Sequence, residues 1–267
     1  MKNEKIIKNY LHILNIDYEI KTLEDITKLI KAHLRTFPFS SLKVLLKEEI
    51  SLDLNSIYEN IVLKKRGGYC FEHNKLMYEV LKELGFNVTH YLGRVVNNTD
   101  NIPPQTHRFT LLAYEGDRYL IDVGIGFRTP SVPVKFGNKP SISHLGIQYK
   151  IIELEDKTFS MQLIEKGKPF NATKFNLNRC YEPDFEMGHF YSYKNPNAVF
   201  TNNFVISLIQ DNVIHSLVNN KYLKIYKNKT EEIEIKNSEQ LEKILKKDLN
   251  LEFTTKEIAF FYAAFFP

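Results

Sequence analysis

The sequence predicts an α+β protein in which helices come first, an antiparallel sheet or barrel follows, and a small mixed segment ends the chain. Up to about residue 85, apolar residues recur at the spacing of amphipathic helices. From about residue 86, runs rich in β-branched and aromatic residues alternate with turn residues. No internal repeat or low-complexity linker interrupts this order.

Two helices are predicted before residue 65. The first begins at Thr22, a suitable N-cap with Asp25 as its acidic partner three residues on, and it must end before Pro38. The second is short and is expected to begin at Asn55 or Ser56. Their apolar positions have helical spacing: Leu23, Ile26, Leu29, Ile30 and Leu34 in the first, and Ile57, Ile61 and Leu63 in the second.

A third helix is predicted from about Cys70 to Leu84, with Gly85 as the residue just after its end. Its apolar stripe consists of Phe71, Met77, Val80, Leu81 and Leu84. Eight strand-like runs follow, at Val88–Val96, Arg108–Tyr114, Arg118–Val123, Tyr149–Leu154, Ser160–Glu165, Phe204–Ile209, Tyr222–Tyr226 and Ile233–Ile235. Ser238 is expected to cap a last helix that reaches about Leu249.

The composition excludes several classes of protein. The chain has 267 residues, 43% of them hydrophobic, which is enough for a sizeable core without disulfides. A net charge of +4 is too small for a nucleic-acid-binding arm. The sequence lacks a secretory signal and a run of about 20 apolar residues, so we expect a cytoplasmic protein with free thiols and no membrane contact.

The most informative segment surrounds Cys70, which opens the third helix after Gly67 and Gly68. Glycines permit a positive φ and the close approach of a ligand. A helix N-terminus supplies unpaired N–H groups and a partial positive charge, which favour the thiolate form of a cysteine and can hold an oxyanion. These features indicate a nucleophile. The other cysteine, Cys180, has no such neighbours and is expected to be a packing or surface thiol.

A thiolate nucleophile needs a base and a group that orients the base. His107 and Asp122 lie on two strand-like runs joined by Glu115-Gly116. If these two residues form the turn, Asp122 lies opposite Phe109. His107, two residues before Phe109, is then the diagonal neighbour of Asp122 on the same face. A three-residue turn would place His107 and Asp122 on opposite faces. Gly124-Ile125-Gly126 follows at once and suggests a loop close to a ligand. The remaining histidines lack the spacing of metal ligands, so no metal site is expected.

Together these motifs resemble those of the arylamine N-acetyltransferase family over nearly the whole chain. Residues 66–72 (Arg-Gly-Gly-Tyr-Cys-Phe-Glu) and then Asn74 match the family's nucleophile motif, Thr106-His107 its base, and residues 119–124 (Tyr-Leu-Ile-Asp-Val-Gly) its acid strand. Residues 33–42, 184–186 and 196–200 resemble further family segments.

The resemblance implies a cysteine-protease-like core with a helical domain (1–85), a β-barrel domain (86–190) and a C-terminal α/β lid (191–267). It implies ping-pong transfer of acetyl from acetyl-CoA to arylamines, arylhydrazines or N-hydroxyarylamines, a reaction of xenobiotic metabolism, without a metal or prosthetic group. Cys70 would be the nucleophile, His107 the base and Asp122 the orienting acid. The remaining implied contacts are Thr106, Ile125 and Phe71 for the acceptor, and Gly124, Gly126, Tyr191 and Asn197 for coenzyme A.

The chain departs from the family pattern at several positions. Ser40-Ser41 replaces Glu-Asn, His189 replaces Asn, Ile125 replaces an aromatic residue, and Pro103-Pro104 occupies a loop that touches coenzyme A elsewhere. Three alternatives stay open at this point: an amide synthase of the same fold that closes a macrolactam, a hydrolase that uses the same triad, and a binding protein with a vestigial triad.

Overall fold

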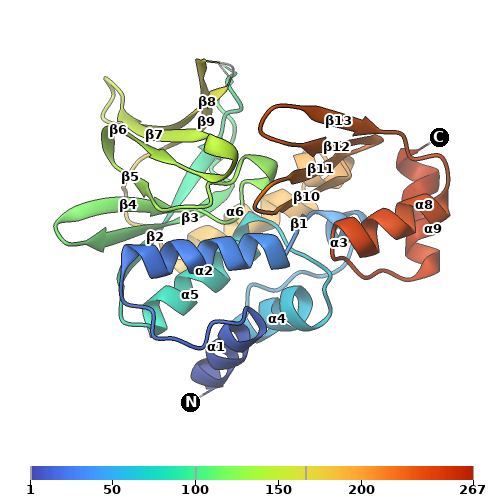
Figure 1. Cartoon of the computed structure of the whole chain (residues 1–267), viewed down its shortest axis with the longest axis horizontal. Coiled ribbons are helices and arrows are strands. Elements are labelled where there is room, and N and C mark those ends of the chain that lie inside the picture. The colour runs from blue at the N-terminus through green and yellow to red at the C-terminus, as the bar shows by residue number, and fades with distance from the viewer. Residues whose placement is uncertain (1, 100, 166, 267) are drawn as a thin grey trace.

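The computed structural model describes residues 2–99, 101–165 and 167–266 and has the predicted α+β organisation (Figure 1). Helices of the first part lie together beside the larger sheet, and the C-terminal helices pack on the smaller one. None of the helices in these residue ranges is long and apolar enough to cross a membrane. The helices of the first part are α1 (Lys2–Ile13), α2 (Leu23–Thr36), α3 (Leu42–Leu45), α4 (Leu54–Tyr58) with a π-helical continuation (Glu59–Leu63), and α5 (Cys70–Glu83).

Helix α2 begins as its sequence predicts. The Asp25 N–H donates to the Thr22 Oγ1 over 3.1 Å, and the Thr22 N–H donates to the Asp25 carboxylate over 3.1 Å. The predicted start of α4 is wrong by two residues or more, because Asp53 is the N-cap. Its carboxylate accepts hydrogen bonds from the backbone N–H groups of Asn55 and Ser56, and a carboxylate satisfies two helix-start donors better than an amide or a hydroxyl.

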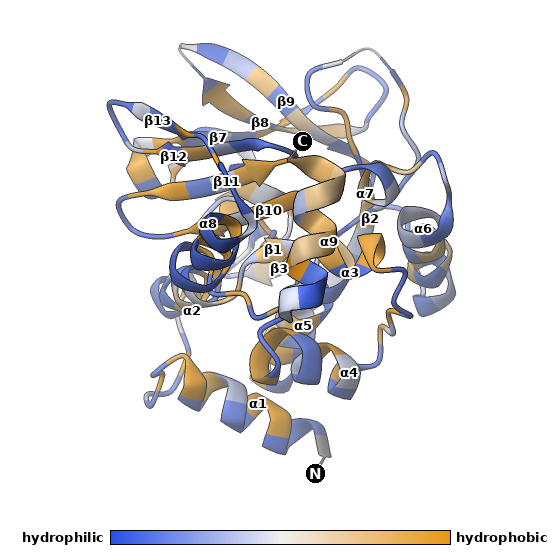
Figure 2. Cartoon of the chain, turned by 90° about the vertical axis from the view of Figure 1, so that its right-hand side faces the viewer, coloured by the Kyte–Doolittle hydropathy of each residue, from blue (hydrophilic) through white to orange (hydrophobic). Residues whose placement is uncertain are grey.

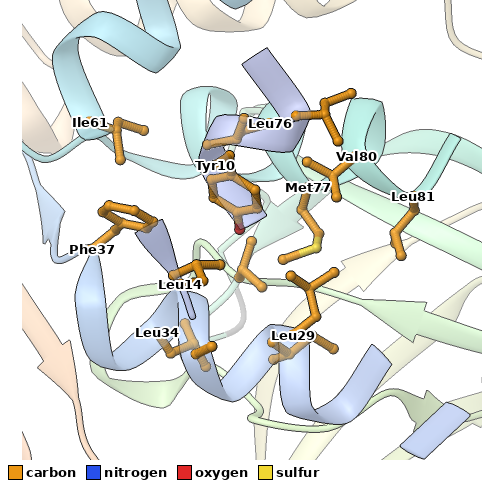
Figure 3. Close-up of a cluster of buried hydrophobic side chains, with 14 of the residues drawn as sticks. Tyr10, Leu14, Leu29, Leu34, Phe37, Ile61, Leu76, Met77, Val80 and Leu81 are labelled. Carbon is orange, nitrogen blue, oxygen red and sulfur yellow. The ribbon is translucent and has the colours of Figure 1, made fainter. Parts of the chain in front are cut away.

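Helices α1, α2 and α5 share one apolar core (Figure 3). The core residues are fully or almost fully buried, and burial of each large side chain contributes roughly 1.5–3 kcal/mol. This core fixes the position of α5 and therefore of its first residue, Cys70. The residues labelled in Figure 3 are Tyr10, Leu14, Leu29, Leu34, Phe37, Ile61, Leu76, Met77, Val80 and Leu81.

The larger sheet has the strand order β5-β4-β3-β2-β9-β8-β7-β6, with every neighbouring pair antiparallel. An isolated bridge joins Phe136, next to the edge strand β5, to Ile151 of β7, beside the other edge strand, so the sheet forms a nearly closed barrel around an apolar interior. Its strands are β2 (Asn87–Val95), β3 (His107–Tyr114), β4 (Asp117–Ile121), β5 (Val134–Lys135), β6 (Gly137–Ile142), β7 (Gln148–Glu153), β8 (Phe159–Glu165) and β9 (Lys168–Phe175).

The smaller sheet has the order β1-β10-β11-β12-β13 and joins two distant parts of the chain. Strand β1 (Phe39–Ser40) comes from the helical first part and pairs with β10 (Val205–Ile209). In Figure 2, β10 is largely hydrophobic, whereas the outlying helix α1 alternates hydrophobic and hydrophilic residues. The other elements of this part are β11 (Ile214–Val218), β12 (Lys221–Ile225), β13 (Thr230–Ile233), α6 (Glu182–Lys194), α7 (Val199–Asn202), α8 (Ser238–Lys243) with a π-helical turn (Ile244–Asp248), and α9 (Thr255–Phe265).

Several of these elements were not predicted. Strands β6 and β9 are rich in polar residues, and each contains a proline, which weakens a strand pattern. The cap predicted at Ser238 is also corrected, since Asn237 accepts the hydrogen bond from the Gln240 N–H, over 2.8 Å. This helix, α8, is not the last one as predicted, because α9 follows it. Domain boundaries at residues 85 and 190 stay a prediction.

Candidate active site

The turn between β3 and β4 determines which residues face each other. Glu115 and Gly116 both have positive φ, 49° and 80°, as a two-residue hairpin turn of the primed type requires. Tyr114 therefore pairs with Asp117, and Thr110 with Ile121. The predicted two-residue turn is confirmed, and continuation of this register places Asp122 opposite Phe109, two residues from His107 on the same face.

His107 and Asp122 meet as this register requires. The His107 Nε2 lies 2.6 Å from the Asp122 Oδ2, and both residues are almost completely buried. Since Nε2 faces the carboxylate, Nδ1 is left for a second partner. The Cys70 sulfur lies close enough to His107 to raise the pKa of its imidazole.

The surroundings of His107 strongly favour the imidazolium. Burial by itself lowers the pKa of His107, but the Asp122 carboxylate and the Cys70 sulfur outweigh this effect and raise it to about 10. Cys70 opens α5, is 3% exposed, and has its Sγ 3.5 Å from the carbonyl oxygen of Thr106. The three residues that the sequence predicts as nucleophile, base and orienting acid are thus all buried and lie close together.

Asn74, one turn after Cys70 on α5, holds the acid in place. Its Nδ2 donates to the Asp122 Oδ1 over 2.9 Å and to the carbonyl oxygen of Arg108 over 2.6 Å, and its Oδ1 accepts from the Val123 N–H over 2.8 Å. The Asn74 side chain therefore joins the nucleophile helix to both strands that carry the triad. Sequence reasoning missed this role, although the i+4 spacing from Cys70 was the available signal.

Gly124 allows the acid strand to approach the nucleophile. A Cβ atom at this position would lie 2.8 Å from the Cys70 Cα and 2.9 Å from the Asn74 Nδ2. Contacts this short with a helix backbone leave room only for glycine.

A pocket of about 340 Å³ opens above the triad, between the barrel, α6, α7 and the smaller sheet. Cys70 and His107 are part of its wall, as are six of the seven residues expected to contact substrates. Those six are Thr106, Gly124, Ile125, Gly126, Tyr191 and Asn197. Pro103-Pro104 also lines it, and the Arg94 Nη1 donates to the Pro103 carbonyl oxygen over 2.5 Å.

Phe71 is the exception, and its expected role as a substrate contact is corrected to one of packing. The ring is fully buried, lies outside the pocket wall and packs edge-on against Tyr69 and His189. The second residue of α5 faces the protein interior behind the nucleophile. A Cβ atom on Gly188 of α6 would lie 2.9 Å from the Phe71 ring, which shows how closely the two helices approach here.

Two buried histidines, His73 and His189, lie outside the pocket, although the position of His73 three residues into the Cys70 helix made it a possible pocket-wall residue. His73 is buried behind α5, where its ring nitrogens face the Pro38 carbonyl oxygen at 3.1 Å and the His33 Nε2 at 2.8 Å. His189 is bound to the Tyr69 hydroxyl and to the Ile50 carbonyl oxygen. Both histidines therefore support the segment around Cys70 from outside the pocket.

A charge cluster around the buried Arg108, beside the triad, was also missed from the sequence. Arg108 is fully buried next to His107, and its guanidinium donates to the Glu182 carboxylate over 3.0 Å. Lys75 donates to the same carboxylate over 2.7 Å. Glu182 thereby attaches α6 to both β3 and α5. Within the described ranges, histidine, cysteine and acidic residues form no group of three that could hold a metal ion.

Known proteins show the same architecture and related sequences. The family model described as N-acetyltransferase matches residues 22–258, which is most of the chain. The arylamine N-acetyltransferase of Escherichia coli (strain K12) is 35% identical over 175 residues, which cover 65% of this chain and 62% of that protein. A Salmonella typhimurium protein named arylamine N-acetyltransferase / N-hydroxyarylamine O-acetyltransferase is 32% identical over 188 residues, which cover 70% and 66%. The chain thus spans slightly less than two thirds of these two relatives.

The structural likeness extends over almost the full length. The solved structure of the Salmonella typhimurium arylamine N-acetyltransferase has a TM-score of 0.90, with 28% identity and coverage of 97% of this chain and 98% of that one. The Mycobacterium tuberculosis arylamine N-acetyltransferase has a TM-score of 0.86, with 27% identity and coverage of 91% and 93%. This chain belongs to the arylamine N-acetyltransferase family.

Proposed function

We propose that the protein transfers an acetyl group from acetyl-CoA to arylamines, arylhydrazines or N-hydroxyarylamines through an acetylated Cys70. The observation that carries this proposal is the group of Cys70, His107 and Asp122 at the inner end of a pocket. A thiol, an imidazole and a carboxylate in this order activate a nucleophile for acyl transfer.

The first half of the reaction acetylates the enzyme. His107 takes the thiol proton, and the Cys70 thiolate attacks the thioester carbonyl carbon. N–H groups at the start of α5 are suited to hold the developing oxyanion. When the tetrahedral intermediate collapses, the bond to the coenzyme A sulfur breaks, and His107 returns its proton to the leaving thiolate. Asp122 stabilises the imidazolium between these two transfers.

The second half transfers the acetyl group to the acceptor. The amine nitrogen attacks the acetyl-cysteine carbonyl, and His107 removes the proton that the new amide must lose. Cys70 then leaves as a thiolate paired with the imidazolium. Burial of the His107–Asp122 pair supports this cycle, because water competes poorly for the proton there.

The pocket wall suggests where the two substrates bind. We assign Thr106 and Ile125 to the acceptor, and Gly124, Gly126, Tyr191 and Asn197 to coenzyme A, since all six line the pocket around Cys70. A pocket volume of about 340 Å³ suits an acceptor with one or two aromatic rings better than a macrocyclic one. This size favours the arylamine reaction over macrolactam closure.

The test is to incubate the protein with acetyl-CoA alone and to measure its intact mass. We expect one added acetyl group, which peptide mapping places on Cys70. Steady-state plots at several acceptor concentrations should be parallel, as expected for a ping-pong reaction. A wild-type protein that stays unmodified while it still turns over an arylamine would contradict the covalent route.

We also propose a cytosolic protein that acts on foreign aromatic amines. Two free thiols, Cys70 and Cys180, support a reducing compartment. Cell fractionation with a marker for each compartment tests the location. Recovery with an extracytoplasmic marker would contradict it.

A further inference from the structure

The pocket wall contains two serine hydroxyl groups that the reaction described above does not use. Ser207 on β10 and Ser216 on β11 are directly paired across the smaller sheet, so their side chains lie on the same face. Both residues are part of the pocket wall, and each is only 4% exposed. Among the hydrogen bonds of the described residues, none involves either hydroxyl, and neither oxygen is among the fully buried atoms that lack a partner, so both oxygens are accessible from the pocket.

Other hydroxyls in the same wall are satisfied by the protein. Ser192 donates to the Gly188 carbonyl oxygen over 2.8 Å, and Thr106 lies within 3.4 Å of the Pro104 carbonyl oxygen. Buried polar groups in proteins almost always have partners, because an unsatisfied one costs about 1–3 kcal/mol. The hydroxyls of Ser207 and Ser216 are therefore available to a molecule in the pocket.

The two serines are a polar patch between apolar rows. On the same face, one row away along the strands, lie Val205 and its partner Val218, which also line the pocket. In the other direction lie Ile209 and its partner Ile214, which are buried in the core. An aromatic ring that packs against Val205 and Val218 brings its substituent to the hydroxyls.

Ser207 and Ser216 lie in one row that leads away from the Cys70 segment. Gly68, two residues before Cys70, bridges to Phe39, and Phe39 pairs with Ser207, which pairs with Ser216. Cys70 and both serines line the same pocket, so an acceptor whose amine faces Cys70 extends its ring toward this part of the wall.

Charge in the wall favours a neutral substituent. Arg128 is the one permanently charged residue that lines the pocket within the described ranges, and its Nε donates to the Glu165 carboxylate over 2.8 Å. Its guanidinium also stacks on the rings of Phe127 and Phe170, at 4.3 and 4.2 Å from their centroids. Because the Glu165 carboxylate already neutralises the Arg128 guanidinium, a carboxylate on the acceptor ring would gain little from binding there.

We propose that Ser207 and Ser216 form a subsite for a neutral hydrogen-bonding substituent, such as a hydroxyl or an amide, on the ring of the acceptor. This inference rests on the proposed function and names the acceptor class. A hydroxyl can both donate and accept, so the pair can hold either kind of group. The subsite selects among arylamines and takes no part in the chemistry at Cys70.

The test compares two acceptors of similar size, 4-hydroxyaniline and 4-methylaniline, with the wild type and a Ser207→Ala/Ser216→Ala variant. We expect kcat/KM for the hydroxylated amine to fall about two- to tenfold per serine, with little change for the methylated amine. Formation of the acetyl-enzyme from acetyl-CoA is measured for both proteins, so that a change in the first half-reaction is separated from a change in the use of the acceptor. Ser238→Ala, on α8 outside the pocket, is the matched control and should leave the ratio unaltered.

A binding measurement separates this inference from the proposed function. Calorimetric titration of both amines into Cys70→Ala protein, with and without the serine substitutions, requires no acetyl transfer. Loss of the preference for 4-hydroxyaniline in the serine variant supports the subsite even if no acetyl-enzyme forms. An equal preference in both proteins would overturn it and would mean that water satisfies the hydroxyls. If 4-aminobenzoate binds more tightly than 4-hydroxyaniline, and substitution of Arg128 removes this difference, the proposal that the subsite takes a neutral substituent is overturned.

Discussion

The first turn of α5 and its last two turns are both buried, yet they are built from different chemistry. The first turn presents Cys70, Glu72, His73 and Asn74, none more than 3% exposed. The later turns present Leu76, Met77, Val80 and Leu81, all at 0%. The apolar half needs only a complementary surface, whereas each polar group in the first turn needs a particular partner. Glu72, for example, is paired with Lys43 over 2.7 Å.

This comparison shows where stability and activity are located on one helix. Leucine and methionine side chains hold α5 in the core, and the polar turn uses that fixed position to align the triad. Substitutions in the two halves should therefore have separable effects.

The largest effect is expected from Cys70→Ala. The nucleophile is lost, so we expect turnover to fall by about 10³-fold or more, without an acetylated protein. Thermal unfolding should change little, since only one small atom is removed. Turnover and intact mass with acetyl-CoA are the measurements. A variant within about tenfold of the parent would refute the assignment.

Asp122→Asn should reduce the rate by roughly 10²–10⁴-fold, because the amide can favour the wrong imidazole tautomer. The pKa of His107 should fall from about 10, since the carboxylate is the main group that raises it. Alkylation of Cys70 by iodoacetamide at neutral pH should also be slower in the variant than in the parent, because His107 loses the carboxylate that orients it beside the thiol.

Equal alkylation rates and equal turnover in the two proteins would make Asp122 structural and reduce the triad to a dyad. The hairpin register offers a second measurement. Insertion of one residue between Glu115 and Gly116 should turn Asp122 to the other face, unless a bulge absorbs it.

A matched pair of variants compares the two halves of α5 directly. Leu81→Ala should lower the free energy of unfolding by about 2–5 kcal/mol and leave kcat of the folded protein unchanged. Asn74→Ala should lower it by about 1–3 kcal/mol, because the Val123 N–H loses its buried partner. It should also reduce kcat, since Asp122 loses a hydrogen bond. The measurements are urea unfolding, and turnover at temperatures below the unfolding transition. A loss of kcat in Leu81→Ala but not in Asn74→Ala would contradict the assignment of stability and activity to different halves of α5.

Acid should destabilise the polar half through His73. Burial lowers the pKa of His73 to about 4, although the nearby Glu72 carboxylate acts in the opposite direction. The folded protein therefore binds this proton more weakly than the unfolded chain, whose histidine pKa is about 6.5. The contribution of neutral His73 to the free energy of unfolding is complete above pH 6.5. It is lost as the pH falls to about 4, which lowers the free energy of unfolding by up to about 3 kcal/mol.

This acid sensitivity can be measured as the free energy of unfolding from pH 7 to 4.5. His73→Asn should make the profile flatter, whereas His12→Gln, at an exposed position of α1, should not. Parallel profiles for the parent and His73→Asn would show that other groups cause the acid loss.

The smallest effect is expected from Ile125→Phe. Ile125 lines the pocket beside the triad, and a ring there could stack on an arylamine, a contact worth about 0.5–1.5 kcal/mol. We expect kcat/KM for the acceptor to change about two- to tenfold, by different factors for small and bulky arylamines. An identical ranking and magnitude would mean that Ile125 does not contact the acceptor.

Sequence patterns predicted what depends on neighbouring residues. Helix α5, the capping box at Thr22 and the Glu115-Gly116 turn were all predicted from local spacing, and the turn brings His107 to Asp122. Predictions failed where polar residues obscure the pattern, as in β6 and β9, or where several residues could cap a helix, as at Asp53 and Asn237. Such choices depend on neighbours that a short window does not contain.

By itself, the sequence determined the reactive groups and the hairpin that pairs two of them, because hydrogen bonds within a turn are decided by adjacent residues. Only the tertiary structure decided that β1 pairs with β10, that Asn74 joins the helix to the hairpin, and that Phe71 faces inward while Ser207 and Ser216 face the pocket. These contacts join residues far apart in the chain. Many alternative pairings satisfy the same local patterns, so packing of the whole core selects among them.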